Sequence, residues 1–205
     1  MSELTSPLLD GLGWVEHGFG TRHSAVTQDG MASLKQIHSN VAHVADRPTG
    51  CVGEGDALLT NEVGLTVSIR TADCYPILLA DPEHRAVAAI HAGWRGTAAG
   101  IAGEAINRMQ NVYGSRAESI YAAIGPGIGV CCYEIGEEVA RKFGMPNAGR
   151  LDLAAENRKQ LIAAGVPEAQ ISTVARCTYC DADRFFSYRR EGERAGRMIS
   201  FIRRV

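Results

Sequence analysis

Residues 64–96 constrain the fold more than any other part of this sequence. Apolar residues gather there into three short runs separated by polar residues, and we predict three strands, over residues 67–70, 75–80 and 85–91. A glycine-bounded turn at 93–96 follows, and apolar residues then recur at helical spacing over 97–113. Consecutive strands leading into a long helix predict a sheet with a helix packed on it.

The rest of the chain supplies further strands and two more helices. Strands are predicted at 13–21, within 34–45, and at 119–124, 171–176 and 198–202, with a hairpin-like connection at 61–64 and a further candidate strand at 185–188. Helices are predicted at 134–143 and 154–164. Strands alternate with helices only in the middle of the chain, which favours an α/β (α+β) fold with mixed sheets over a doubly wound nucleotide-binding fold. No linker is visible, so residues 1–205 are predicted to form a single domain.

The composition excludes several classes of partner. A formal net charge of −2 and a pI of about 6.3 give no basic footprint for nucleic acid. No apolar run approaches the length of a membrane span, and the first ten residues lack a secretory signal. The six cysteines are therefore expected to be reduced thiols in a cytoplasmic protein.

Three residues are candidates for chemistry. Cys74 follows a polar interruption between two apolar strands, and Pro76 indicates a strand end or bulge close to it. His91 lies at the far end of the third strand, and His38 lies in or beside an earlier one. Reactive groups at strand ends can project into a shared cleft while the sheet holds them still. We therefore predict that the three side chains face one another.

Two chemistries fit this trio, and the residues themselves do not choose between them. One thiolate and two imidazoles leave a coordination position open and match a catalytic zinc site. Cys74 activated by His91 would instead be the nucleophile of a cysteine hydrolase. Arg95, in the turn after His91, is a candidate ligand for phosphate or an oxyanion beside the start of the helix.

Other polar residues receive plainer interpretations. Cys177 and Cys180 have the spacing of metal or redox sites, but no second such pair is present, so these thiols and the adjacent Cys131 and Cys132 are predicted to be buried and structural. Asn157 and its neighbour in the helix are predicted to be solvated.

A set of motifs nevertheless resembles a known family. The matching segments are Gly18-Phe19-Gly20-Thr21-Arg22, Lys35-Gln36-Ile37-His38, Arg70-Thr71-Ala72-Asp73-Cys74, His91-Ala92-Gly93-Trp94-Arg95-Gly96, Ile124-Gly125-Pro126, Cys131-Cys132-Tyr133-Glu134-Ile135-Gly136, Cys177-Thr178-Tyr179-Cys180 and Phe186-Ser187-Tyr188-Arg189-Arg190. Together they resemble the purine nucleoside phosphorylase/laccase-domain family, long labelled multicopper polyphenol oxidase. The resemblance spans nearly the whole chain.

The resemblance implies a four-layer α/β/β/α sandwich and a zinc ion, with copper as an alternative, bound by His38, Cys74 and His91. It also implies phosphorolysis of adenosine, inosine and methylthioadenosine, deamination of adenosine, and a phosphate ligand at Arg22. Two departures bear on the substrate range. The segment between Thr21 and Lys35 is shorter than the family's loop-and-helix insertion, and Gly127 stands where members often carry a cysteine.

The predicted function is a zinc-dependent purine nucleoside phosphorylase with adenosine deaminase activity, whose partners are nucleosides and phosphate. The alternatives are a metal-free cysteine hydrolase or amidase using Cys74 and His91, a copper-dependent polyphenol oxidase, and a non-enzymatic cell-wall quality-control protein. Multicopper oxidation needs several centres with multiple imidazoles, and six histidines in all are few for that activity.

Overall fold

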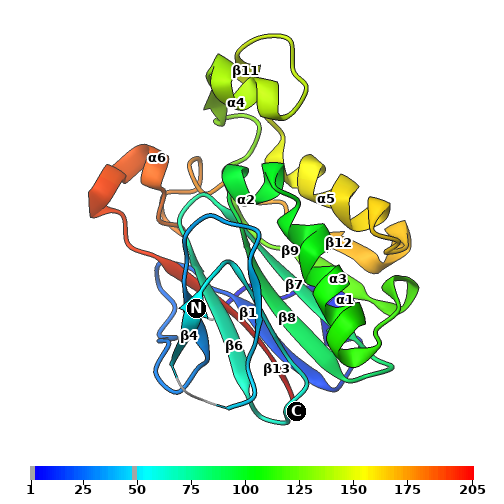
Figure 1. Cartoon of the computed structure of the whole chain (residues 1–205). Coiled ribbons are helices and arrows are strands. Elements are labelled where there is room, and N and C mark those ends of the chain that lie inside the picture. Colours follow the sequence, from blue (N-terminus) through cyan, green and yellow to red (C-terminus); the bar gives the residue numbers. More distant parts are fainter. Residues whose placement is uncertain (1–2, 48–49) are drawn as a thin grey trace.

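The computed structural model describes residues 3–47 and 50–205 and is built on two packed sheets (Figure 1). The larger sheet has the order β12-β9-β7-β8-β5-β3 and the smaller one β1-β13-β6. The larger sheet contains β3 (Ala42–Val44), β5 (Ala57–Thr60), β7 (Tyr75–Asp81), β8 (Ala86–Ala92), β9 (Tyr121–Ile124) and β12 (Ile171–Thr173). The smaller contains β1 (Val15–Phe19), β6 (Thr66–Thr71) and β13 (Met198–Arg204).

Two short ribbons and a set of helices complete the fold. The ribbons pair β2 (Ser33–Lys35) with β4 (Cys51–Glu54), and β10 (Glu134–Ile135) with β11 (Gly149–Arg150). The α-helices are α1 (Pro7–Asp10), α2 (Trp94–Ala98), α3 (Ile101–Tyr113), α4 (Glu137–Lys142), α5 (Leu153–Ala163) and α6 (Tyr188–Glu191). The larger sheet is mixed, since β3 runs parallel to β5 and β12 parallel to β9 while the other pairs are antiparallel. The predicted mixed α/β class is thus confirmed.

The central strands β7 and β8 are buried on both faces, which explains their continuous apolar runs. Ile77 and Leu79 face a core formed with α3, whereas Leu78 faces a second core formed with the smaller sheet. Figure 1 shows α3 and α5 covering the helical side of the larger sheet. Cys74 and His91 therefore lie at the ends of strands that are fixed between two cores, with His91 buried and Cys74 half-buried.

A loop covers the outer face of the smaller sheet at Ser68. Ser68, which alternates with the inward-facing Val67 and Ile69, is fully buried and accepts a hydrogen bond from the Gln28 side chain at 3.0 Å. Gln28 belongs to the short segment between Thr21 and Lys35.

Several predicted elements differ in the structure. The helix at 97–113 is two helices, because Gly100 adopts a left-handed conformation with φ of 82° between α2 and α3. The hairpin at 61–64 is wrong: β5 belongs to the larger sheet and β6 to the smaller, so this connection crosses between layers. The helix at 134–143 begins only at Glu137, since Glu134 and Ile135 pair with β11. The candidate strand at 185–188 is a loop leading into α6.

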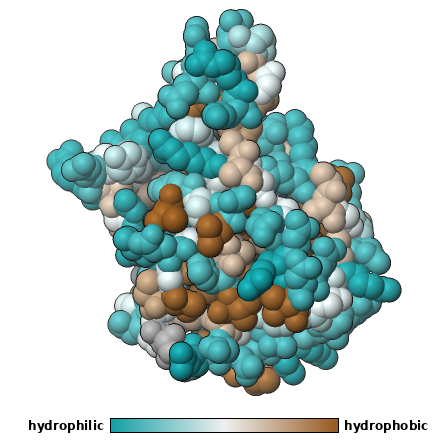
Figure 2. Space-filling model, viewed as in Figure 1, coloured by the Kyte–Doolittle hydropathy of each residue, from teal (hydrophilic) through white to brown (hydrophobic). Residues whose placement is uncertain are grey.

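The visible face is mainly hydrophilic, with a band of hydrophobic residues across its lower half (Figure 2). Across the described ranges, none of the helices combines the length and apolar character needed to cross a membrane.

Candidate metal centre and substrate cavity

The fold brings His38, Cys74 and His91 together from three parts of the chain. His38 lies in the loop between β2 and β3, Cys74 lies at the turn between β6 and β7, and His91 is near the end of β8. One ring nitrogen of each histidine and the Cys74 sulfur lie within 4.8 Å of one another. The two imidazole rings meet edge to face, with centroids 4.9 Å apart. The three donors therefore surround a volume that one metal ion can occupy.

A buried carboxylate, Asp56, positions both histidines. Its Oδ1 lies 2.8 Å from His91 Nδ1 and accepts the backbone N–H of His38 at 3.1 Å. Its Oδ2 accepts the backbone N–H and the hydroxyl of Ser39 at 2.6 and 2.7 Å. His38 has φ of 59°, an uncommon conformation for a residue with a side chain, and these bonds hold the loop in it. Since Nδ1 of His91 is taken by Asp56, its Nε2 is left free to bind a ligand.

The electrostatics of the site favour charged forms. Burial alone would raise the pKa of Asp56, but hydrogen bonds from His91 and Ser39 outweigh it and lower the pKa to about 2. Burial also opposes ionisation of Cys74, yet the charge of His91 and hydrogen bonds from both histidines lower the pKa of the thiol to about 6. In the same way the Cys74 thiolate and Asp56 overcome burial and raise the pKa of His91 to about 9. A thiolate is the form that binds metals and attacks electrophiles.

The turn that presents Cys74 is held by its neighbour Asp73, which has φ of 83°. The Asp73 carboxylate is buried and accepts hydrogen bonds from the hydroxyls of Thr178 and Ser187, at 2.6 and 3.1 Å, and from the backbone N–H of Arg189 at 2.7 Å. These bonds engage Asp73 with Thr178, Ser187 and Arg189 rather than with the Cys74 thiol. Asp73 ties the C-terminal segment to the turn at Cys74.

A cavity of about 870 Å³ opens onto the trio. Its remaining lining combines four arginines with three aromatic residues and a few neutral or acidic groups: Arg70, Arg95, Arg189, Arg197, Trp94, Tyr133, Tyr188, Gln36, Ala72, Asp73, Ile128 and Ala195. The Arg95 guanidinium stacks 4.3 Å from the centre of the Trp94 ring. The Arg189 guanidinium lies 5.5 Å from the centre of the Tyr133 ring. Cationic and aromatic groups of this kind recognise anions and flat apolar rings.

Arg22, the other residue predicted to bind phosphate, is not brought into this lining. Its guanidinium forms an ion pair with Glu191 at 2.9 Å and stacks 4.7 Å from the centre of the Phe186 ring. A phosphate role for Arg22 stays a prediction, and it would require the guanidinium to leave Glu191.

The sequence interpretation missed several residues of the site. Asp56 could have been suspected, because a carboxylate directly before the wholly buried strand β5 needs partners. The mixed charges near the C-terminus predict a solvated strand face for Arg189 and Arg197, but both line the cavity. Asn157 was predicted to be solvated; it is fully buried and accepts a hydrogen bond from the Thr97 hydroxyl at 3.1 Å.

The remaining histidines lie outside the trio. Each has its own polar partner: His17 with the backbone of Ser6, His23 with the carbonyl of Asp183, His43 with the carbonyl of Glu54, and His84 with Asp81. Within residues 3–47 and 50–205, the groups of three or more side chains suited to a metal ion are the trio and a cluster of four cysteines. Imidazoles are thus available for one mixed nitrogen–sulfur centre rather than for several copper centres.

Comparison with known proteins identifies the family. The family described as "Multi-copper polyphenol oxidoreductase laccase" matches residues 19–205. The chain belongs to this family.

Curated members of this laccase-domain family carry other activities in their names. A purine nucleoside phosphorylase of Deinococcus radiodurans is 43% identical over 184 residues, which cover 85% of this chain and 70% of that protein. A purine nucleoside phosphorylase of Bacteroides thetaiotaomicron is 43% identical over 72% of this chain, and the match spans only 60% of that relative's length. An adenosine deaminase, RL5, from an unknown prokaryotic organism is 40% identical over 73% of this chain and 62% of its own.

Solved structures share the fold almost throughout. YlmD from Geobacillus stearothermophilus superposes with a TM-score of 0.89 at 30% identity, covering 97% of this chain and 94% of that one. A hypothetical protein of Bacillus licheniformis, YfiH, gives a TM-score of 0.87 at 28% identity and covers 93% of each chain.

Proposed function

We propose that this chain is a zinc-dependent purine nucleoside phosphorylase that acts on adenosine, inosine and methylthioadenosine and also deaminates adenosine. The observation that carries the proposal is the position of His38, Cys74 and His91 at a cavity lined by four arginines and three aromatic residues. The names of the relatives, purine nucleoside phosphorylase and adenosine deaminase, support the same reaction class.

The donor set fits the metal that the family resemblance implies. Two imidazoles and one thiolate are ligands that zinc accepts, and three protein ligands leave a position for water or substrate. Asp56 on the outer nitrogen of His91 completes the carboxylate–histidine arrangement common around such ions. Copper also binds imidazole and thiolate, but three protein ligands with one open position are the arrangement of catalytic zinc sites. When bound, zinc would polarise an oxygen atom of water or substrate.

The other residues of the cavity would position the reactants. In phosphorolysis, phosphate attacks C1′ of the ribose and the purine leaves, so the anion must be held close to the sugar. Arg95, Arg70 and Arg197 are candidates to bind the phosphate oxygens, since guanidinium groups match them in geometry and charge. Tyr133 and Trp94 offer faces on which a purine ring can stack. In deamination, water replaces the 6-amino group of adenosine and ammonia leaves. This reaction also needs the purine to be held in the cavity, and the same aromatic side chains could hold it.

The decisive experiment replaces the thiolate. Cys74→Ala should abolish phosphate-dependent release of hypoxanthine from inosine and remove the zinc of this site, with an unchanged circular dichroism spectrum. Cys51→Ala is the matched control, because Cys51 is exposed and lies outside both metal-binding groups. Retained turnover in Cys74→Ala would remove the thiolate from the mechanism.

A metal-free cysteine hydrolase is the second candidate, since the site also stabilises a thiolate beside a protonated His91. Chelator treatment separates the two. Loss of activity on zinc removal, with recovery on zinc addition, supports the phosphorylase. Activity that survives the chelator and disappears on thiol alkylation supports the hydrolase.

A further inference from the structure

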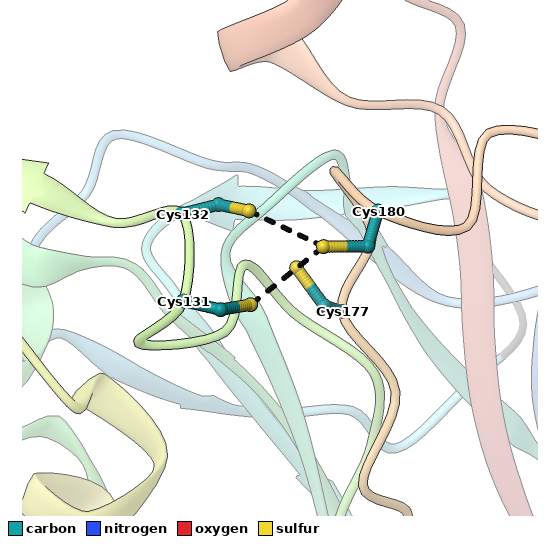
Figure 3. Close-up of side chains that lie close together, drawn as sticks. All are labelled: Cys131, Cys132, Cys177 and Cys180. Atoms are coloured by element: carbon teal, nitrogen blue, oxygen red, sulfur yellow. Dashed lines mark hydrogen bonds between the residues drawn. The ribbon is translucent and has the colours of Figure 1, made fainter.

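A second group of metal-binding side chains lies outside the trio. Cys131 and Cys132 come from the loop before β10, and Cys177 and Cys180 come from the segment after β12. Figure 3 shows their four side chains directed toward one another. The four sulfur atoms lie within 4.8 Å of one another, and all four cysteines are free thiols. The prediction of buried thiols is wrong, because Cys131 and Cys180 are exposed and the other two are only half-buried.

We propose that Cys131, Cys132, Cys177 and Cys180 bind one zinc ion as a tetrathiolate site, separate from the trio at the cavity. Four sulfur atoms placed about 2.3 Å from one zinc ion stand about 3.8 Å apart in a tetrahedron. In this chain the Cys180 sulfur lies 3.3 Å from that of Cys132 and 3.7 Å from that of Cys131. The thiols are already grouped at the spacing that a single ion requires.

The chemistry of the group favours zinc over other uses of four thiols. Thiolate sulfur is a soft ligand, and a tetrahedral set of four selects zinc or iron rather than magnesium or calcium. A polynuclear iron–sulfur cluster would need some of the four sulfurs farther apart, since its cysteines are divided among two or more iron atoms. Structural zinc sites are closed by four protein ligands, as this group is. The trio, with three ligands, keeps a position open.

The surroundings of the four cysteines suit thiolate ligands. The backbone N–H of Gly129 donates to the Cys177 sulfur at 3.2 Å, a contact that offsets negative charge on sulfur. Arg190 donates to the carbonyl oxygens of Thr178 and Tyr179, at 2.9 and 2.7 Å. These two residues separate Cys177 from Cys180, so Arg190, whose guanidinium also pairs with Glu191 at 2.6 Å, holds the loop that carries both cysteines.

The site would fasten together two walls of the substrate cavity. The loop with Cys131 and Cys132 also carries Ile128 and Tyr133, which line the cavity. The segment with Cys177 and Cys180 continues to Tyr188 and Arg189, which also line it. Between the two segments the backbone pairs only locally, at Gly127 with Cys177. A zinc ion shared by all four cysteines would add a strong cross-link there, with a structural rather than a chemical role.

Metal stoichiometry tests the proposal without any substrate, so its failure and that of the proposed phosphorylase are distinguishable. The protein is reduced, freed of metal and then reconstituted with Zn²⁺. After removal of excess metal it should hold two zinc ions per chain. Cys74→Ala should hold one, the double variant Cys131→Ser/Cys180→Ser should hold one, and the control Cys51→Ser should hold two.

Cobalt identifies the ligands of the remaining ion. Cys74→Ala reconstituted with Co²⁺ should show intense thiolate-to-cobalt charge-transfer absorption, which a site without sulfur lacks. This measurement decides the question even if the double variant fails to fold. A single zinc equivalent in the wild-type chain that Cys74→Ala removes would overturn the proposal, as would cobalt spectra of Cys74→Ala without that absorption.

Discussion

At the scale of single residues, Asp56 links two of the three candidate ligands, His38 and His91, without being one of the three. It is fully buried and binds the ring of His91 together with the backbone of the loop that carries His38. A buried carboxylate without hydrogen-bond donors would lower the stability of the fold. The donors that Asp56 binds belong to His91 and to the loop that carries His38. One side chain thus sets the direction of one imidazole and the backbone position of the other.

Removal of this charge should loosen the centre. We expect Asp56→Asn to lower the zinc affinity of the trio by about 10- to 100-fold, because His91 loses its carboxylate partner and the loop at His38 loses acceptors. Isothermal titration calorimetry, with zinc added to the metal-free protein, measures this affinity. Asp81→Asn is the matched control, since Asp81 is equally buried and pairs with His84 at 2.8 Å, away from the cavity. Equal affinities in the two variants would deny Asp56 this positioning role.

At the scale of elements, the centre depends on strand ends and on the turn that follows β8. Gly93 caps the start of α2, and the turn passes close to the trio. A β-carbon on Gly93 would lie 2.9 Å from the Cys74 sulfur and 3.1 Å from Cδ2 of His38. The glycine is therefore needed for close approach of the backbone to the ligands.

Two glycine substitutions separate this requirement from helix stability. Gly93→Ala should displace Cys74 or His38 and reduce the zinc affinity of the trio by at least about tenfold. Gly103→Ala, inside α3, meets no atom within 4 Å and should raise the unfolding free energy by about 0.5–1 kcal/mol with unchanged zinc affinity. Zinc titration and urea unfolding of both variants measure the contrast. Unaltered zinc affinity in Gly93→Ala would show that the turn can shift to accept the β-carbon without displacing the zinc ligands.

At the scale of the whole molecule, the larger sheet serves two cores at once. Ile77 and Leu78 are adjacent on β7 and fully buried, yet one faces the helices and the other the smaller sheet. Since the same strands belong to both cores, neither can open without disturbing the other. The rigid part of the fold is also the part from whose ends Cys74 and His91 project.

Shared strands predict a single cooperative unfolding transition. Ile77→Ala and Leu78→Ala should each lower the unfolding free energy by about 2–5 kcal/mol and move the same transition. Circular dichroism monitors the loss of secondary structure. Tryptophan fluorescence monitors Trp14 in the inter-sheet core and Trp94 at the cavity. The exposed Val63→Ala should change little. Different unfolding midpoints from the two probes would show that the two cores unfold separately.

Local patterns predicted some parts of the molecule well. The strands around Cys74 and His91 were identified with their ends in nearly the right places, because burial on both faces leaves an unbroken apolar run. The break at Gly100 and the sheet change between β5 and β6 were missed, since neither alters apolar periodicity. The place of Arg189 and Arg197 in the cavity was missed, because the residues beside them come from distant segments, and the phosphate role of Arg22 stays a prediction.

The chain's own order of residues determined its family, its class of fold and the identity of the three candidate ligands, because motifs and apolar periods are properties of neighbours in sequence. Only the tertiary structure decided that Asp56 holds the ring of His91 and the backbone of His38, that four arginines line the cavity and that two cysteine pairs meet. Those convergences depend on which strands pair and which layers pack. Burial of apolar surface drives both, and no local pattern records them.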